Sequence, residues 1–402
     1  MFNRILNRFI NYISFDTQSN DTTNTHPSTA KQKDLGAFLV KELHSLGINN
    51  AYIDDFGYVY AKINGTKDTK TTVGLIAHMD TALEFPGKVL NPNIIKNYQG
   101  EDIILKNGIN LNTRDYPSLK NTIGHTIITT DGTTLLGADD KAGIAIIMTT
   151  LEELLNGNYS YPNLFIAFTP DEEIGEGTAK FNFDYFKADF AYTLDGGPIS
   201  VINYENFNAA SAEITFTGKS IHPGSAKDKM VNSQLLAMEF QSMLPNIRPE
   251  NTDNYEGFNH LSSINGSVSE TKCDYIIRNH NNDLFEKQIK DFENITKYLN
   301  EKYGYTAVSL KVNYSYKNMK EKVNEKPYVL EYPVKALKAL GYNPTFVPIR
   351  GGTDGARLSF KGIVCPNLGT GGDYMHGPYE YVSVDDMENM VKVVIKTLDL
   401  IK

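Results

Sequence analysis

The chain has 402 residues, 41% of them hydrophobic, and a formal net charge of −9 at pH 7. This length allows two or three domains with buried cores, and the acidic balance, without runs of Lys or Arg, argues against nucleic acids and anionic membranes as partners. No apolar stretch reaches transmembrane length, and the two distant cysteines, Cys273 and Cys365, indicate neither a disulfide framework nor a thiolate metal site. We therefore expect a soluble, cytoplasmic protein.

The N-terminal part of the chain predicts helices followed by strands. Apolar residues recur with helical spacing over residues 2–13 and 31–46, whereas residues 59–63 and 73–77 are typical of strands. The second strand runs into His78 and Asp80, which share a face because alternate strand residues point the same way. This pair is typical of a metal-binding imidazole oriented by a carboxylate, although a histidine that merely caps a loop is commoner for this spacing alone.

An adjacent pair of acids, Asp139 and Asp140, precedes a strongly apolar stretch that predicts a largely buried helix. The residues before the pair, 84–134, are irregular, and short strands are expected around 127–128 and 135–136. A carboxylate at the mouth of a helix lies near positive backbone N–H groups. Taken alone, such an acid is as often a helix cap as a functional group.

Two further apolar strands, 164–168 and 190–194, also end in acids. The first leads into Asp171, Glu172 and Glu173, and the second leads into Asp195. Acids that an apolar strand points inward are costly unless cations or water neutralise them. Strands alternating with helices predict an α/β fold, in which a mixed β-sheet flanked by helices carries a site along one edge.

The pattern changes after residue 206. Strands are expected at 211–217, 260–268, 272–278 and 307–315, with helices at 230–244 and 284–303, which is the β-α-β-β-α-β order of a ferredoxin-like module. We therefore predict an inserted ferredoxin-like α+β domain at 207–316, and a discontinuous catalytic domain made of 1–206 and 317–402. The latter would end with a helix at 333–340, a short strand at 345–348, a glycine-rich turn at 350–355 and a last helix at 384–400.

The candidate ligands are two imidazoles and three carboxylates: His78, Asp139, Glu173, Asp195 and His376. Such a set suits two borderline divalent metals with one carboxylate bridging. Two metals close together polarise a carbonyl and activate a shared water. Glu172 neighbours a ligand without having to be one, so it can take the proton of that water and pass it on.

Several motifs spread over nearly the whole chain resemble one known family. They are His78-Met79-Asp80-Thr81, residues 129–132 and 135–145, 167–173, Asp195-Gly196-Gly197, residues 205–210, His222-Pro223-Gly224, residues 275–278 and residues 348–355. In these segments the sequence is similar to the peptidase T family of tripeptide aminopeptidases. That family belongs to the dizinc exopeptidases, which include aminoacylases, carboxypeptidases and succinyl-diaminopimelate desuccinylase.

The resemblance implies a role for each site residue. It makes His78, Asp139, Glu173, Asp195 and His376 the ligands of two zinc ions, for which cobalt or manganese could substitute. It makes Asp139 the bridging ligand, Asp80 the acid that orients the histidine, and Glu172 the general base. It also implies a cis peptide bond between Asp139 and Asp140. The sequence departs from the family pattern at residues 371–376 and at Asn279-His280, which affects substrate detail more than the metal site.

The expected substrate is a tripeptide, from which the enzyme releases the N-terminal residue. By resemblance, His222 helps to bind the substrate carbonyl or the transition state, although an exposed loop histidine is usually ordinary. Arg278 and Arg350 are candidates for the substrate carboxylate, because a guanidinium pairs with it through two hydrogen bonds. Either arginine could instead make a structural ion pair.

The sequence also predicts how the protein assembles and leaves other functions open. The edge strand and open face of the ferredoxin-like domain suit a homodimer, in which the family pattern brings His222 of one subunit to the other subunit's metal site. A carboxypeptidase or an N-acyl amino acid deacylase would use the same metals. A non-catalytic binding protein would be expected to lack Glu172 or a ligand, and none is lost.

Overall fold

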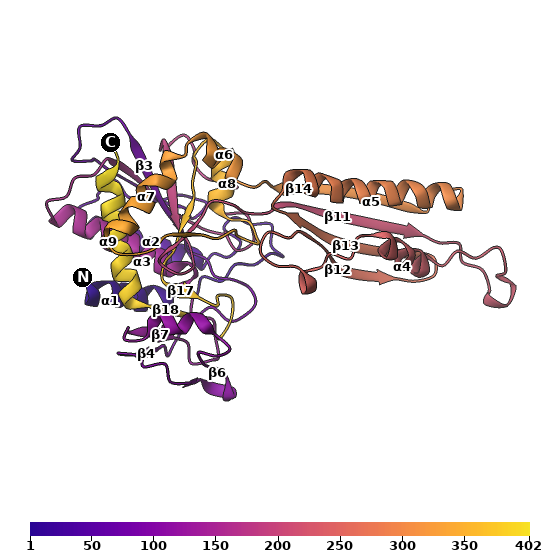
Figure 1. Ribbon diagram of the computed structural model, residues 1–402, viewed down its shortest axis with the longest axis horizontal. Coiled ribbons are helices and arrows are strands. Elements are labelled where there is room, and N and C mark those ends of the chain that lie inside the picture. Colours follow the sequence, from indigo (N-terminus) through magenta and orange to yellow (C-terminus); the bar gives the residue numbers. More distant parts are fainter. The chain divides into compact units, whose positions relative to one another are not determined.

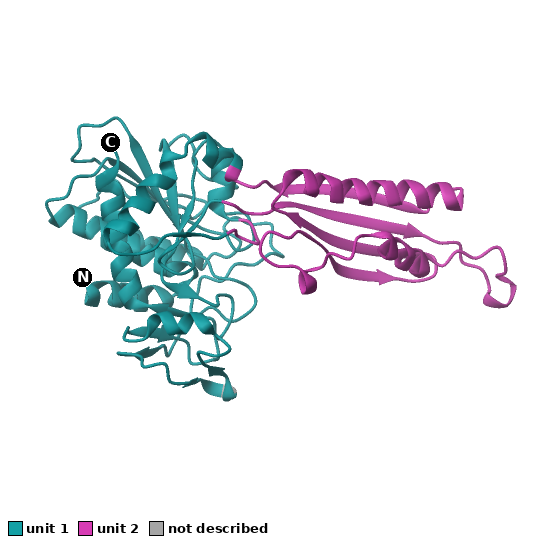
Figure 2. Ribbon diagram, viewed as in Figure 1, with its two compact units in different colours: residues 1–204, 321–347, 353–402 teal, residues 205–320, 348–352 magenta. Residues whose placement is uncertain are grey.

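The computed structural model describes residues 1–402, apart from the side chain of Asn107. The chain forms two compact units, coloured separately in Figure 2. Unit 1 comprises residues 1–204, 321–347 and 353–402, and unit 2 comprises residues 205–320 and 348–352. The segment predicted as the second domain, 207–316, lies within unit 2, which also includes residues 348–352.

Unit 1 is built on a mixed eight-stranded sheet with the order β1-β2-β8-β3-β9-β16-β10-β15. Its strand β3 is labelled in Figure 1. Its strands are β1 (Tyr52–Ile53), β2 (Val59–Ile63), β3 (Thr72–His78), β8 (Asn163–Thr169), β9 (Phe190–Leu194), β10 (Val201–Asn203), β15 (Thr345–Phe346) and β16 (Asn367–Leu368). The central strands β8, β3 and β9 are parallel, whereas β2 pairs with β8 in antiparallel orientation. The prediction of an α/β fold with a mixed sheet is therefore confirmed.

The helices of this part of the chain pack on the sheet and on one another. They are α1 (Phe2–Ile13), α2 (Gln32–Ser45), α3 (Ala138–Asn156), α6 (Lys320–Glu325), α7 (Tyr328–Ala339), α8 (Asp354–Phe360) and α9 (Val384–Leu400). Helix α3 packs against β3 and β9 of the sheet and against the helices α1 and α9. It is buried along most of its length because it lies between these layers, as its nearly continuous apolar sequence predicts.

A small second sheet in unit 1, with the order β17-β18-β7-β4, replaces the irregular connection expected from the sequence. Its strands are β4 (Asn93–Ile95), β7 (Ile127–Thr129), β17 (Gly372–Asp373) and β18 (Tyr381–Ser383); a hairpin of β5 (Ile103–Ile104) and β6 (Asn110–Leu111) and the short helices η1 (Lys106–Gly108) and η2 (Pro117–Thr122) belong to the same connection. The predicted strand at 127–128 is confirmed. The strand expected at 135–136 is wrong, because the N–H of Leu136 donates to the side chain of Glu380 and not to a neighbouring strand.

Unit 2 is an antiparallel sheet with the order β12-β13-β11-β14, covered by two helices. Its elements are β11 (Asn208–Thr217), η3 (Pro223–Ser225), α4 (Ser233–Met243), η4 (Pro249–Asn251), β12 (Phe258–Gly266), β13 (Glu270–Asn279), α5 (Asn282–Tyr303) and β14 (Val308–Tyr316). Residues of β11, α4, β13 and α5, among them Phe216, Phe240, Tyr275 and Phe292, form one core. The ferredoxin-like prediction is therefore confirmed.

Helix α7 begins earlier than the sequence predicts, at Tyr328 instead of Pro333. A proline inside a helix has no N–H to donate to the carbonyl four residues earlier, here that of Val329. The hydroxyl of Tyr192 donates to that carbonyl at 2.7 Å, so the group is satisfied. The predicted turn at 350–355 is also shorter, because Thr353 caps α8, which begins at Asp354.

No helix in the described part of the chain combines the length and apolarity that crossing a membrane demands.

Candidate metal centre and active site

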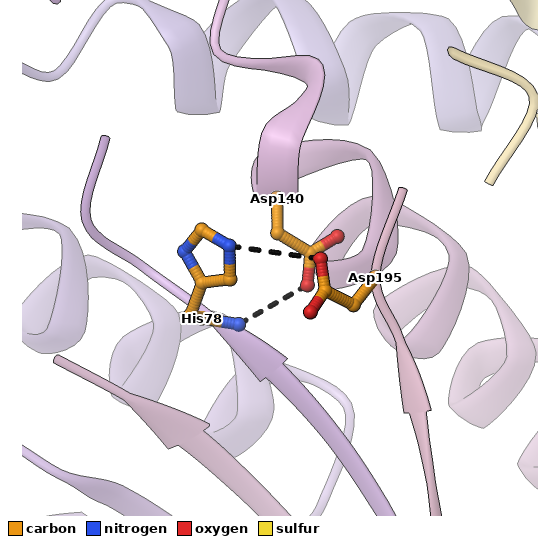
Figure 3. Close-up of side chains that lie close together, drawn as sticks. All are labelled: His78, Asp140 and Asp195. Atoms are coloured by element: carbon orange, nitrogen blue, oxygen red, sulfur yellow. Dashed lines mark hydrogen bonds and ion pairs between the residues drawn. The ribbon is translucent and has the colours of Figure 1, made fainter. Parts of the chain in front are cut away.

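The candidate site lies where three parallel strands of unit 1 end. Because β8, β3 and β9 are neighbours in the sheet, their carboxyl ends meet at one edge. His78 is the last residue of β3, Asp195 follows β9, and α3 brings its first turn to the same place (Figure 3).

Asp139 lies between the two predicted histidine ligands. Its Oδ1 is 2.8 Å from Nε2 of His78, and its Oδ2 is 3.4 Å from Nε2 of His376. Each of these two Nε2 atoms has one further carboxylate beside it: Oδ1 of Asp195 is 3.8 Å from Nε2 of His78, and Oε2 of Glu173 is 3.1 Å from Nε2 of His376. The structure thus brings the five predicted ligands together as two halves that share Asp139.

The chemistry of this cluster fits divalent cations. His78, Asp139 and Glu173 form one group whose donor atoms all lie within 4.8 Å of one another, and could hold a metal ion. Oε1 of Glu173 is buried without a hydrogen-bond partner in the described chain. Burying this oxygen is costly unless a cation coordinates it. The ion pairs recorded for the three carboxylates of the two halves are all with histidines, so no Lys or Arg among the described residues replaces a metal.

Asp140 is a candidate ligand that the sequence did not single out. With His78 and Asp195 it forms a second group that could hold a metal ion, shown in Figure 3. Its Oδ2 accepts the backbone N–H of His78 at 3.1 Å, whereas its Oδ1 is buried without a partner in the described residues. The peptide bond between Asp139 and Asp140 is cis, as the resemblance implies. The signal for Asp140 was present as an adjacent pair of acids, but only the first acid of the pair was assigned.

The pKa values of the cluster show that its two histidines supply too little positive charge to balance its carboxylates. Burial raises the pKa of Asp195 to about 8, and the charge of Asp139 adds to this effect. Burial and the same charge raise the pKa of Glu173 to about 7. Despite its burial, Asp139 has a lowered pKa, because His376 and His78 hydrogen-bond to it. Hydrogen bonds to Asp139 and Glu173 raise the pKa of His376 to about 11. Two imidazoles do not balance these acids, and such an arrangement favours a bound cation.

Asp80 links His78 to the loop that carries the two glutamates. Its backbone carbonyl oxygen lies 3.1 Å from Nδ1 of His78, and its Oδ1 lies 3.5 Å from the same nitrogen. The two carboxylate oxygens also accept the N–H groups of Glu172 and Glu173 at 3.0 and 3.1 Å, and the Ser19 hydroxyl donates to Oδ2. Asp80 is therefore positioned to fix the ring and the loop together, with its carbonyl as the nearer partner of the ring.

Glu172 faces a different partner from that of Glu173. Its Oε1 accepts the backbone N–H of Asp354, the first residue of α8, at 3.2 Å. Burial raises the pKa of Glu172 well above its usual value, and the charges of Asp195 and Asp354 act in the same direction. Asp354, whose Oδ2 accepts the Thr169 hydroxyl at 2.8 Å, was not predicted at the site, because it lies 182 residues along the chain from Glu172.

Asp171, the first acid of the same loop, turns away from the cluster. Its carboxylate accepts the N–H of Ser28 at 2.7 Å, the Ser28 hydroxyl at 2.5 Å and the side-chain amide of Gln32 at 2.7 Å. Its backbone has a φ of 58°, in the left-handed region. Its Oδ2 also lies 3.3 Å from Nδ1 of His26. These partners satisfy Asp171, which attaches residues 26–32 to the end of β8.

The three predicted substrate-binding residues belong to unit 2. His222 is exposed, and its Nδ1 accepts the N–H of Gly224 at 3.2 Å. The Arg278 guanidinium donates to the carbonyls of Ala210 and Ile277 at 3.0 and 2.9 Å. That of Arg350 donates to carbonyls of residues 252, 254 and 256. Among the residues that the structure describes, neither arginine makes the structural ion pair considered for it. All three binding roles stay predictions.

A last acid near the cluster, Glu380, was also missed. It is buried, follows His376 by four residues, and accepts backbone N–H groups from the segment that leads into α3. The sequence contains no local signal for this role, because those donors lie more than 200 residues away along the chain.

Comparison with known proteins agrees with this architecture. The family described as "Peptidase dimerisation domain" matches residues 204–304, and the family described as "M42 glutamyl aminopeptidase" matches residues 122–232. In fold, the chain is similar to aminopeptidase PepT from Bacillus cereus, with a TM-score of 0.80 and 21% identity over 99% of this chain and 98% of the other. A tripeptidase from Staphylococcus aureus gives a TM-score of 0.79 and 20% identity over 100% and 98% of the two chains.

The fold and the site therefore define a metallopeptidase with an inserted dimerisation domain. Peptidase T of Caldanaerobacter subterraneus subsp. tengcongensis is 48% identical over 402 residues, which cover 99% of this chain and 98% of that protein. The chain belongs to the peptidase T family, and the resemblance seen in its motifs is confirmed.

Replacing Asp171 by alanine should destabilise the protein. The change leaves the three donors from Ser28 and Gln32 without an acceptor, and each orphaned buried group costs about 1–3 kcal/mol. We expect Asp171→Ala to lower the free energy of unfolding by about 3 kcal/mol or more in urea titrations followed by circular dichroism. Asp171→Asn should lose less, because Asn keeps one acceptor and tolerates positive φ. An Asp171→Ala protein as stable as one carrying Asp184→Ala, at an exposed acid of the same unit, would contradict this account.

Proposed function

We propose that this protein is a metal-dependent aminopeptidase that releases the N-terminal residue from tripeptides. The observation that carries the proposal is the position of Asp139, whose two oxygens face His78 and His376, each beside a further carboxylate. Membership of the peptidase T family supports it. So does the similarity in fold to an aminopeptidase and a tripeptidase.

We propose two zinc ions as the native cofactor, with cobalt or manganese as substitutes. One half of the site would use His78, Asp139 and Asp195, and the other would use His376, Asp139 and Glu173. Oxygen and imidazole donors without a thiolate suit exchangeable metals of this class. When bound, such ions polarise a carbonyl and activate water. A dinuclear metal-binding peptidase of the M20 family from Bacillus subtilis shares the fold, with a TM-score of 0.65 at 13% identity.

Glu172 is the proposed general base. It takes a proton from the attacking water and passes it to the leaving amine, which needs a carboxylate that can hold the proton between the two steps. Burial raises its pKa well above the usual value, which strengthens it as a base. Asp80 orients His78, and His222 contributes a hydrogen bond to the oxyanion.

Recognition of the carboxyl end of the substrate is assigned to Arg350, with Arg278 as a second candidate. A guanidinium that pairs with the C-terminal carboxylate would explain a limit on peptide length. The acids beside the metals would hold the free ammonium at the other end. The alternatives are a carboxypeptidase or an N-acyl amino acid deacylase built on the same residues.

We further propose a homodimer formed through unit 2, supported by the match of residues 204–304 to peptidase dimerisation domains. By resemblance, His222 would act at the metal site of the partner subunit. A location in the cytoplasm is part of the same proposal.

A panel of peptides tests the function directly. We expect cleavage of a free tripeptide at its first peptide bond, and a strongly raised KM for the same tripeptide with an amidated C-terminus, because the carboxylate contact is lost. An N-acetylated tripeptide and an N-acyl amino acid should not be cleaved. Faster hydrolysis of the N-acyl amino acid would favour the deacylase instead, and release of the C-terminal residue would favour the carboxypeptidase.

Metal content tests whether Asp139 is a ligand of both metal ions. Wild-type protein dialysed against zinc should retain about two ions per chain. Asp195→Asn and Glu173→Gln should each lose about one, because each belongs to one half, whereas Asp139→Asn should lose both. Elemental analysis measures the content, and Asp184→Asn, at an exposed acid, is the control. Equal losses in all three site variants would rule out a shared ligand.

Replacement of Glu172 separates the base from the ligands. Glu172→Gln should keep both metals but lower kcat by at least ~10²–10⁴-fold, the usual contribution of a general base. Its matched control is Glu176→Gln, in the same loop but exposed, which should keep normal kcat. Turnover of Glu172→Gln close to that of the control would show that another group takes the proton.

A further inference from the structure

Glu380 occupies an unusual position for a buried acid. Only 1% of its surface is exposed, and it lies between His376 and β18 in the chain. Its partners are backbone donors of the segment that leads into α3. Oε2 accepts the N–H groups of Leu136 and Gly137 at 2.6 and 2.9 Å, and Oε1 accepts the N–H of Asp139 at 3.0 Å.

The three N–H donors lie just before helix α3 and at its start. Helix α3 is preceded by Gly137, which has no side chain to accept an unpaired N–H group, and Asp139 and Asp140 at its start have non-helical backbone angles. Gly137 also has a φ of 75°, in the left-handed region. Glu380 therefore supplies, from a distant part of the chain, the acceptor that the local sequence lacks.

The same carboxylate connects two predicted ligands. Asp139 is held through its own N–H, while His376 lies four residues before Glu380 on the same loop. Nε2 of His376 is 3.4 Å from Oδ2 of Asp139. The distance between these two ligands therefore depends on the hydrogen bond from the N–H of Asp139 to Glu380 and on the four-residue step from His376 to Glu380.

We propose that Glu380 is a positioning residue that holds the bridging carboxylate of Asp139 in register with His376, so that the second metal binds tightly. This inference rests on the proposed metal site. Outer partners of metal ligands typically change metal affinity by 10–100-fold when they are replaced. The alternative is that Glu380 only caps α3 and contributes to stability alone.

Glu380→Gln separates these two roles. An amide of the same shape offers one acceptor oxygen, so its NH2 group must face at least one of the three N–H donors. The control is Ser383→Ala, which removes the N-cap of α9, where the Ser383 hydroxyl accepts the N–H of Asp386 at 3.0 Å. Both variants lose an acceptor of backbone N–H groups in unit 1, but only Glu380 accepts the N–H of a predicted ligand.

The measurements are Tm, the dissociation constants for zinc by competition with a chelator, and the visible spectrum of the cobalt-loaded protein. We expect Glu380→Gln to bind the weaker zinc ion about 10–100-fold less tightly and to shift the cobalt bands. Ser383→Ala should lower Tm with both metal readouts unchanged. Wild-type zinc affinity and cobalt bands in Glu380→Gln would overturn the positioning role, whatever its Tm.

A second variant and a wild-type measurement complete the test. If Glu380→Gln does not fold, Glu380→Asp, which keeps the charge but is shorter by one methylene, decides by the same titration. Wild-type affinity in that variant would overturn the proposal, and weakened affinity would support it. A wild-type protein that binds no zinc in the same assay would overturn the metal-dependent function itself, which distinguishes the two failures.

Discussion

The structure of unit 1 depends on how acids are accommodated at one edge of its sheet. Asp139, Asp140, Glu173 and Asp195 approach one another where β3, β8 and β9 end. In the described part of the chain, the ion pairs of Asp139, Glu173 and Asp195 are with His78 and His376. Burying carboxylates near one another is unfavourable, because each disfavours the ionised form of its neighbours. Burial raises the pKa of Asp195 and of Glu173, and the neighbouring charge of Asp139 adds to this effect. Cation binding removes that cost, so the same feature that destabilises the empty fold creates affinity for metal.

The acids around this edge divide into two groups by their hydrogen-bond partners. Asp80, Asp171 and Glu380 accept backbone N–H groups, together with neutral side chains for the first two. Such carboxylates act as structural acceptors that fix loops and helix starts. Glu173 and Asp140 each keep one buried oxygen without a partner in the described chain. That unmet bonding capacity indicates Glu173 and Asp140 as candidate ligands, whereas Asp139 and Asp195 are indicated by their distances to the histidines.

Most regular elements could be predicted because their signals are local. The apolar periodicity of residues 384–400 and 59–63 corresponds to α9 and β2 with the same bounds. The apolar pair Leu135-Leu136 misled the prediction, since two buried residues in a connecting segment look the same as a short strand. Among the site residues, those that end strands were found, because the edge of a parallel sheet gathers them. Asp354 and Glu380 were not found, since their partners lie far away in sequence and involve backbone groups that carry no residue signature.

Arg350 shows how a residue can serve the scaffold and still suit a ligand. Its guanidinium donates to the carbonyls of Thr252, Asn254 and Glu256 and lies over the rings of Phe207 and Phe258, which ties residues 348–352 into unit 2. Carbonyls and aromatic faces orient the group without neutralising its full charge, and no ion pair with a carboxylate is recorded for it among the described residues. A cation held rigidly by neutral partners loses little conformational entropy when an anion binds. The proposed contact with a peptide carboxylate would therefore be made by a guanidinium that the scaffold of unit 2 already holds in place.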